Sequence, residues 1–171
     1  MSRLVGTGPG AVTPLVVGVD HIWKRLLAGE SGISPIQSFD VSDLPCRIAG
    51  VLPDGDTADG NFNEEDWVSR KDRRKMDRFI VFAIAAAKQA VRDSGWVADS
   101  EEDQERTGVL IGSGTGGLPG IAEAAVILEK RGPRRISPFF IPANLINLCS
   151  GHVSIEYGFR GPNHAVVTAC A

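Results

Sequence analysis

A glycine-rich segment that follows an apolar run near the middle of the chain constrains the fold more than any other feature. The run, residues 107–111, is short and apolar, as expected of a strand buried on both faces of a sheet. It leads into Gly112-Ser113-Gly114-Thr115-Gly116-Gly117, after which Pro119 and Gly132 mark the expected start and end of a helix. A strand, a glycine turn and a helix in this order indicate an α/β fold.

The remaining segments alternate in the same way. Apolar residues recur at i, i+3, i+4 and i+7 from residue 76 onwards, which predicts a long amphipathic helix that ends at Ser94-Gly95. Shorter helices are expected over residues 20–28 and 144–157, strands over residues 4–7 and 164–168, and loops over residues 50–60, 99–105 and 137–143. Strands that alternate with helices predict a layered α/β architecture.

Length and composition bound the class of protein. At 171 residues the chain has room for one domain, or two at most, and 43% hydrophobic residues are enough to build a core. A net charge of −3 argues against nucleic acid as the main partner. The longest stretch without a charged residue, 136–155, contains Pro138, Pro142 and Asn144, so we expect no membrane span. Since no targeting segment is visible, we expect a cytoplasmic protein.

The three cysteines and three histidines offer few catalytic combinations. The spacing of Cys46, Cys149 and Cys170 excludes a disulfide scaffold and a zinc ribbon, and no metal-ligand spacing exists among the histidines. Cys170 follows an apolar strand, where either a nucleophile or a core cysteine can stand, whereas Cys46 and Cys149 are expected to be structural. His164 cannot activate Cys170 along the strand, because six residues at ~3.3 Å each separate them by about 20 Å.

The glycine segment admits a nucleotide-binding interpretation. Gly112, Gly114 and Gly117 satisfy the G-x-G-x-x-G pattern between a strand and a helix. A dinucleotide site also requires a second strand that ends in an acidic residue about 20 residues on, and no such strand follows here. The sequence therefore favours a role in tight turns and close packing, with a nucleotide-binding module as the alternative.

Residues 70–75 form a basic run, with five cations in six positions. Such a run is typical of a solvated helix start, or of a docking patch for an acidic partner. Aromatic residues that could stack on bases are not interleaved with it, which makes nucleic acid the weakest of the three interpretations.

Six segments, in order over nearly the whole chain, match one known family. They are Trp23 to Ile33, Ser69-Arg70-Lys71 with Arg74-Lys75-Met76-Asp77, Ile111 to Leu118, Gly132-Pro133-Arg134-Arg135 to Pro142, Tyr157-Gly158 with Arg160-Gly161-Pro162, and Val167-Thr168-Ala169-Cys170-Ala171. The chain resembles the N-terminal part of the beta-ketoacyl-acyl carrier protein synthases, closest to the type II condensing enzyme of bacterial fatty acid synthesis.

This resemblance implies a thiolase-like fold, in which two similar α/β halves stack as α-β-α-β-α layers, and it implies a homodimer. Residues 1–171 would form the N-terminal synthase domain, cut just after the nucleophile. The family's two catalytic histidines and its lysine belong to the second half, which this chain lacks. We therefore expect the chain alone to be inactive and to expose apolar surface, including residues 79–87.

The resemblance also implies site residues and a reaction. Cys170 would carry the growing acyl chain as a thioester, and malonyl-acyl carrier protein would decarboxylate and attack it, giving 3-oxoacyl-acyl carrier protein without a metal or cofactor. Lys71, Arg74 and Lys75 would dock the acidic carrier protein, and Thr115 would gate the acyl pocket. A non-catalytic protein that only pairs with a full-length subunit or with carrier protein is the alternative.

Overall fold

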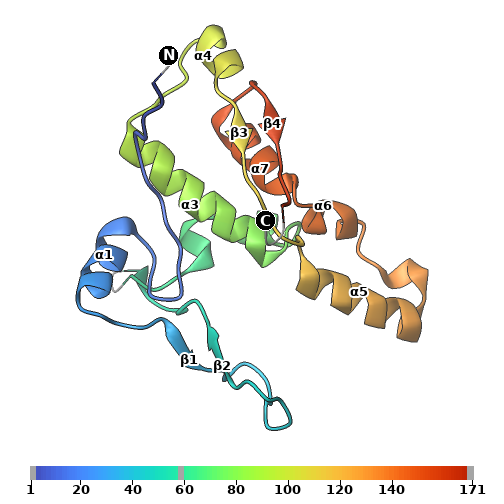
Figure 1. The fold of residues 1–171 in the computed structure, drawn as a ribbon. Helices are drawn as coiled ribbons and strands as arrows, with labels where there is room; N and C mark the ends of the chain where they lie inside the picture. The colour runs from blue at the N-terminus through green and yellow to red at the C-terminus, as the bar shows by residue number, and fades with distance from the viewer. Residues whose placement is uncertain (1–2, 58–59, 169–171) are drawn as a thin grey trace. The chain divides into compact units, whose positions relative to one another are not determined.

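The computed structural model describes residues 3–57 and 60–168. It divides into two compact units, one of residues 1–64 and 88–95 and the other of residues 65–87 and 96–171. Helix α3 (Arg78–Ser94), the long green helix of Figure 1, contributes residues to both units. Its predicted amphipathic pattern and its end at Ser94-Gly95 are confirmed.

The first unit contains helix α1 (Val19–Leu27) and the antiparallel pair β1 (Ile33–Pro35) and β2 (Ile48–Gly50). In its core lie the buried side chains of Val16, Val17, Ile22 and Phe62. The predicted strand over residues 4–7 is wrong: these residues form no strand, and Leu4 is 97% exposed. The glycines and the proline of residues 6–10 explain this, because such a segment favours turns over strand pairing.

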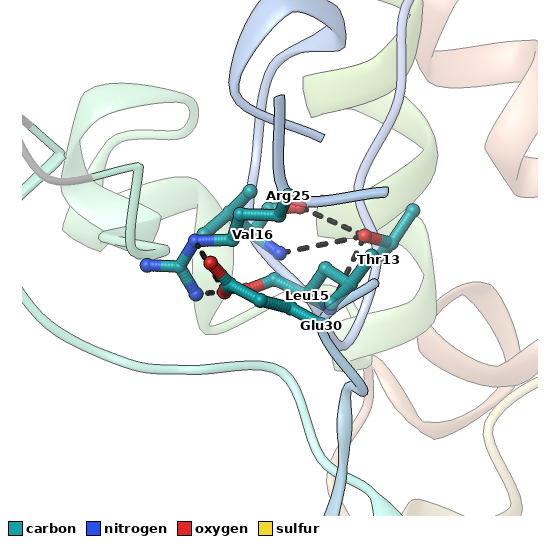
Figure 2. Close-up of polar contacts among 5 residues, drawn as sticks. All are labelled: Thr13, Leu15, Val16, Arg25 and Glu30. Carbon is teal, nitrogen blue, oxygen red and sulfur yellow. Dashed lines mark hydrogen bonds and ion pairs between the residues drawn. The ribbon is translucent and has the colours of Figure 1, made fainter. Parts of the chain in front are cut away.

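Arg25 ties α1 to the segment that precedes it. Its guanidinium donates to the Leu15 carbonyl at 3.0 Å and pairs with the Glu30 carboxylate at 3.5 Å, as Figure 2 shows. Thr13 tightens the same segment, since its hydroxyl donates to the Val16 carbonyl at 3.0 Å. These contacts fix the turn of residues 13–16 and tie it to α1.

The second unit joins short strands to helices. Its elements are the 3-10 turn Pro133–Arg135 and the elements α2 (Arg70–Arg73), α4 (Glu101–Arg106), β3 (Val109–Leu110), α5 (Leu118–Arg131), α6 (Phe140–Asn144), α7 (Leu148–Tyr157) and β4 (Asn163–His164). Strands β3 and β4 are parallel, and Val109 lies opposite Asn163. Helix α7 contacts both strands, and α5 contacts α6 (Figure 1).

Four expectations for this unit are wrong in part. Residues 101–106 form helix α4 instead of a loop, because Ser100 caps the helix by accepting from the Asp103 amide at 3.0 Å. The expected loop over residues 137–143 contains most of α6. The strand over residues 107–111 is confined to β3, whose Leu110 is 66% exposed, and the last strand ends at His164.

The expected exposure of apolar surface is present, but not at the residues named for it. None of residues 79–87 is exposed, and Ile80, Val81, Ile84 and Ala85 are buried. Apolar side chains are exposed elsewhere, among them Ile155 of α7 at 79%. Within the described residues, no helix is both long and apolar enough to cross a membrane.

Candidate functional site

Residues 112–117, here called the glycine loop, are held at both ends. Before the loop, the Ile111 amide donates to the His164 carbonyl at 3.2 Å. At its downstream end, the Gly117 amide donates to the Asn144 carbonyl at 3.2 Å, and within it the Gly116 amide donates to the Ser113 hydroxyl at 3.3 Å. Thr115 lies between these contacts and is exposed. The loop therefore has a fixed base and an exposed tip.

The carboxylate of Asp77 supports the base of the loop. One oxygen, Oδ2, accepts from the Gly120 amide in the first turn of α5 at 3.3 Å, and the other, Oδ1, accepts from the Phe79 amide in the first turn of α3 at 3.4 Å. The Asp77 amide donates to the Ala143 carbonyl of α6 at 3.1 Å. A single residue thus joins the starts of two helices to the end of a third.

The glycines at this base permit close approach. A side chain at Gly117 would collide with the Asn144 amide oxygen and with the Asp77 carboxylate, and Gly120 faces the same two groups. Among the described residues, the buried Asn144 Oδ1 has no hydrogen-bond partner. A carboxylate at the start of α5 also occupies the place where a dinucleotide phosphate would have to bind, which argues against the nucleotide-binding alternative.

The basic run is exposed and is held by local contacts. Ser69 caps α2 by accepting from the Asp72 amide, and the Asp72 carboxylate pairs with Lys75 at 3.1 Å. The Ser69 hydroxyl and then Lys75 lower the pKa of Asp72. Among the described residues, Lys71 and Arg74 form no ion pair, and both are exposed. Their charges are available to a partner.

Arg74 also lines a cavity of about 250 Å³ beside α5 and α6. Its lining mixes apolar and charged groups, among them Ile127, Phe139, Glu123 and Arg135. A second cavity of about 540 Å³ lies in the first unit and contains none of the predicted site residues. The smaller cavity lies below the usual size of a ligand pocket, so it does not identify a substrate by itself.

The predicted nucleophile, Cys170, lies outside the described residues. Of the other two cysteines, Cys46 is exposed and Cys149 is buried in α7. Burial raises the pKa of the Cys149 thiol to about 12, so this thiol stays protonated and inert at neutral pH. Cys149 therefore fits the structural role that the sequence suggested for it.

The three histidines lie within the described residues and differ in burial. Burial lowers the pKa of His152 on α7, against the opposing charges of Asp72 and Glu156. His21 and His164 are exposed. Across residues 3–57 and 60–168, no group of three or more His, Cys, Asp or Glu side chains is placed to hold a metal ion.

The glycine loop and the basic run both match segments that carried the family resemblance. The family model described as "Beta-ketoacyl synthase, N-terminal domain" matches residues 1–171. The chain belongs to the beta-ketoacyl synthase family. It is 55% identical to the 3-oxoacyl-acyl-carrier-protein synthase 2 of Rhizobium meliloti over 171 residues, which cover 100% of this chain and 41% of that protein.

A second relative and a solved structure support the assignment of this chain to the beta-ketoacyl synthase family. The mitochondrial 3-oxoacyl-acyl-carrier-protein synthase of Arabidopsis thaliana is 45% identical over 183 residues, covering 99% of this chain and 39% of that protein. The structure titled "The ishigamide ketosynthase/chain length factor" matches with a TM-score of 0.79 at 29% identity, over 98% of this chain and 40% of that one. The predicted thiolase-like α/β fold is confirmed.

The chain spans about two fifths of the length of the relatives it matches.

Sequence reasoning missed two residues of the site, Asp77 and Asn144, which hold the glycine loop through contacts distant in sequence. The paired glycines Gly117 and Gly120 were the available signal, because two glycines near the start of a helix indicate a close neighbour.

Proposed function

We propose that the full-length protein containing this chain is a condensing enzyme of fatty acid elongation. The observation that carries the proposal is the match of residues 1–171 to the N-terminal synthase domain. It is supported by relatives named 3-oxoacyl-acyl-carrier-protein synthases at up to 55% identity. The chain would be the N-terminal domain of such an enzyme, and the remaining catalytic groups would come from a second half.

In the proposed reaction, the Cys170 thiolate attacks the acyl thioester of the carrier protein and releases the carrier thiol. Malonyl-acyl carrier protein then loses CO₂, and the resulting enolate attacks the acyl-Cys170 thioester. The new carbon–carbon bond forms as the Cys170 thiolate leaves, which gives 3-oxoacyl-acyl carrier protein and restores the enzyme. The Cys170 backbone N–H would be one of the donors to the tetrahedral oxyanion.

Two described regions support the roles proposed for substrate binding. Lys71, Arg74 and Lys75 would attract the acidic carrier protein, and the exposure of Lys71 and Arg74 suits that role. Thr115, at the exposed tip of the glycine loop, would gate the acyl pocket. The homodimer and the cytoplasmic location expected from the sequence belong to the same proposal.

The test uses a full-length form, in which residues 1–171 are continued by the second part of the Rhizobium meliloti relative. This purified protein, given acyl- and malonyl-acyl carrier protein, is expected to release CO₂ and form 3-oxoacyl product. Cys170→Ala should abolish product formation, because the acyl-enzyme can no longer form. Product formation that survives Cys170→Ala would reject the proposed nucleophile, and no product from the unsubstituted protein would reject the proposed function.

The 171-residue chain alone is the second arm of this test. The resemblance assigns the enolate-stabilising histidines to the second half. We therefore expect the chain alone to show no turnover above its own Cys170→Ala variant. Turnover comparable to the full-length form would require a base within these residues.

A further inference from the structure

Asp77, just after the basic run, makes contacts unlike those of Asp72 within the run. Its two carboxylate oxygens accept from the first turns of two different helices, α3 at Phe79 and α5 at Gly120. Asp72, only five positions earlier, instead pairs with Lys75 and Ser69 at the surface. One carboxylate therefore links the end of the basic run to the helix that follows the glycine loop.

The local structure of α5 explains why a distant residue provides this contact. The helix is preceded by Gly117, which has no side chain to cap the exposed amides of the first turn. A larger residue there would collide with Asn144 and Asp77. Asp77 supplies the missing acceptor from 43 residues away, and its negative charge is favourable at the positive end of the helix.

We propose that Asp77 is a positioning residue that fixes the glycine loop relative to the basic run and thereby sets acyl-chain selectivity. This inference rests on the proposed function, in which Thr115 gates the acyl pocket and Lys71, Arg74 and Lys75 dock the carrier protein. The base of the loop is held by Asp77 and Asn144, whereas Thr115 at its tip is exposed. A loosened base lets Thr115 move aside more easily, which favours long acyl chains over short ones.

The test compares two substitutions that remove the same charge from neighbouring positions of the full-length form. Asp77→Asn keeps the shape of the side chain but leaves only one oxygen for the two backbone amides, so one of its two hydrogen bonds is lost. Asp72→Asn removes an equal charge that contacts Ser69 and Lys75 and makes no bond to α5. Any effect of charge alone on carrier docking appears in both variants.

For Asp77→Asn we expect the ratio of kcat/KM for a long acyl primer to that for a short one to rise about threefold or more, which is the low end of what the loss of one hydrogen bond is worth. Asp72→Asn should change kcat/KM for both primers equally and leave the ratio unchanged. Hydrogen exchange at the Gly120 amide should become faster in Asp77→Asn, with no such change in α7.

Two results would overturn the inference while leaving the proposed function intact. One is an equal loss of kcat/KM for all primers in Asp77→Asn, which would indicate a general structural role. The other is an unchanged ratio together with unchanged exchange at Gly120. If the unsubstituted protein forms no 3-oxoacyl product from any primer, the proposed function fails and this inference fails with it.

A second variant keeps the test decisive if Asp77→Asn folds poorly. Gly120→Ala places a methyl group 3.2 Å from Asp77 Oδ2 and closer still to the Asn144 amide oxygen, so it disturbs the same contact from the side of α5. The ratio should rise in this variant too. A ratio equal to that of the unsubstituted protein would reject Asp77 as the residue that positions the loop.

Discussion

The basic run and the glycine loop belong to the same unit, but they are held in different ways. The basic run is held in part by short-range contacts, Ser69 with Asp72 and Asp72 with Lys75. The glycine loop depends on Asp77 and Asn144, which lie far from it in sequence. Charged residues on a surface stabilised by local contacts can be replaced at little cost in stability. Residues of a loop stabilised by close backbone packing cannot be enlarged without a steric clash.

The largest effect is expected from reversing charge in the basic run. Replacing Lys71, Arg74 and Lys75 by Glu in the full-length form should lower kcat/KM for acyl carrier protein by about 10- to 100-fold at low salt, through slower association. The difference should shrink as salt is added, because Lys71 and Arg74 are exposed and Lys75 is only partly buried, so their charges are screened. Thermal unfolding should change little.

The matched control reverses three exposed cations elsewhere, Arg3, Lys24 and Arg92, with the same change in net charge. Steady-state kinetics over a range of salt concentrations separates the two variants. If both lose the same activity, net charge alone is responsible, and the basic run is an ordinary solvated helix start.

The glycine loop, unlike the basic run, should lose stability when a single methyl group is added to it. Gly117→Ala forces a side chain against Asn144 and Asp77, and overpacking of this kind costs about 1–3 kcal/mol. Gly114→Ala is the control within the same loop, because nothing lies within 4 Å of its added carbon. Urea unfolding of the full-length form should give a lower midpoint for Gly117→Ala only, and equal midpoints would contradict the close packing.

The same contrast explains what the sequence could predict. Three local patterns each predicted their element correctly. They are the basic run at α2, Pro119 at the start of α5, and the helical spacing of apolar residues in α3. The role of Asp77 depends on a partner 43 residues away, which no local pattern contains. The length of β3 and β4 was also overestimated, because an apolar run shows that a strand is possible and not how far its neighbour extends.

Acyl selectivity should respond to the size of the residue at the tip of the loop. Thr115→Phe in the full-length form should lower the long-to-short primer ratio of kcat/KM by about tenfold, because the ring would fill the mouth of the proposed pocket. Thr115→Val, which removes the hydroxyl at nearly constant volume, is the control and should leave the ratio close to its original value. An unchanged ratio in Thr115→Phe would show that Thr115 does not line that pocket.

The smallest effect concerns His152, which is half-buried on α7 and lies within electrostatic reach of Asp72 and Lys75 in the basic run. Burial lowers its pKa in the folded protein, so the unfolded chain takes up a proton first as the pH falls. The free energy of unfolding should therefore decrease as the pH drops below about 6.5, the ordinary histidine pKa.

Urea midpoints of the full-length form between pH 7.5 and 5.5 measure this decrease. It should be weaker in His152→Gln and should persist in His21→Gln, which replaces an exposed histidine of α1. An identical decrease in all three proteins would mean that protonation of His152 is not responsible. The charges of the basic run would then not act on the stability of α7 through this residue.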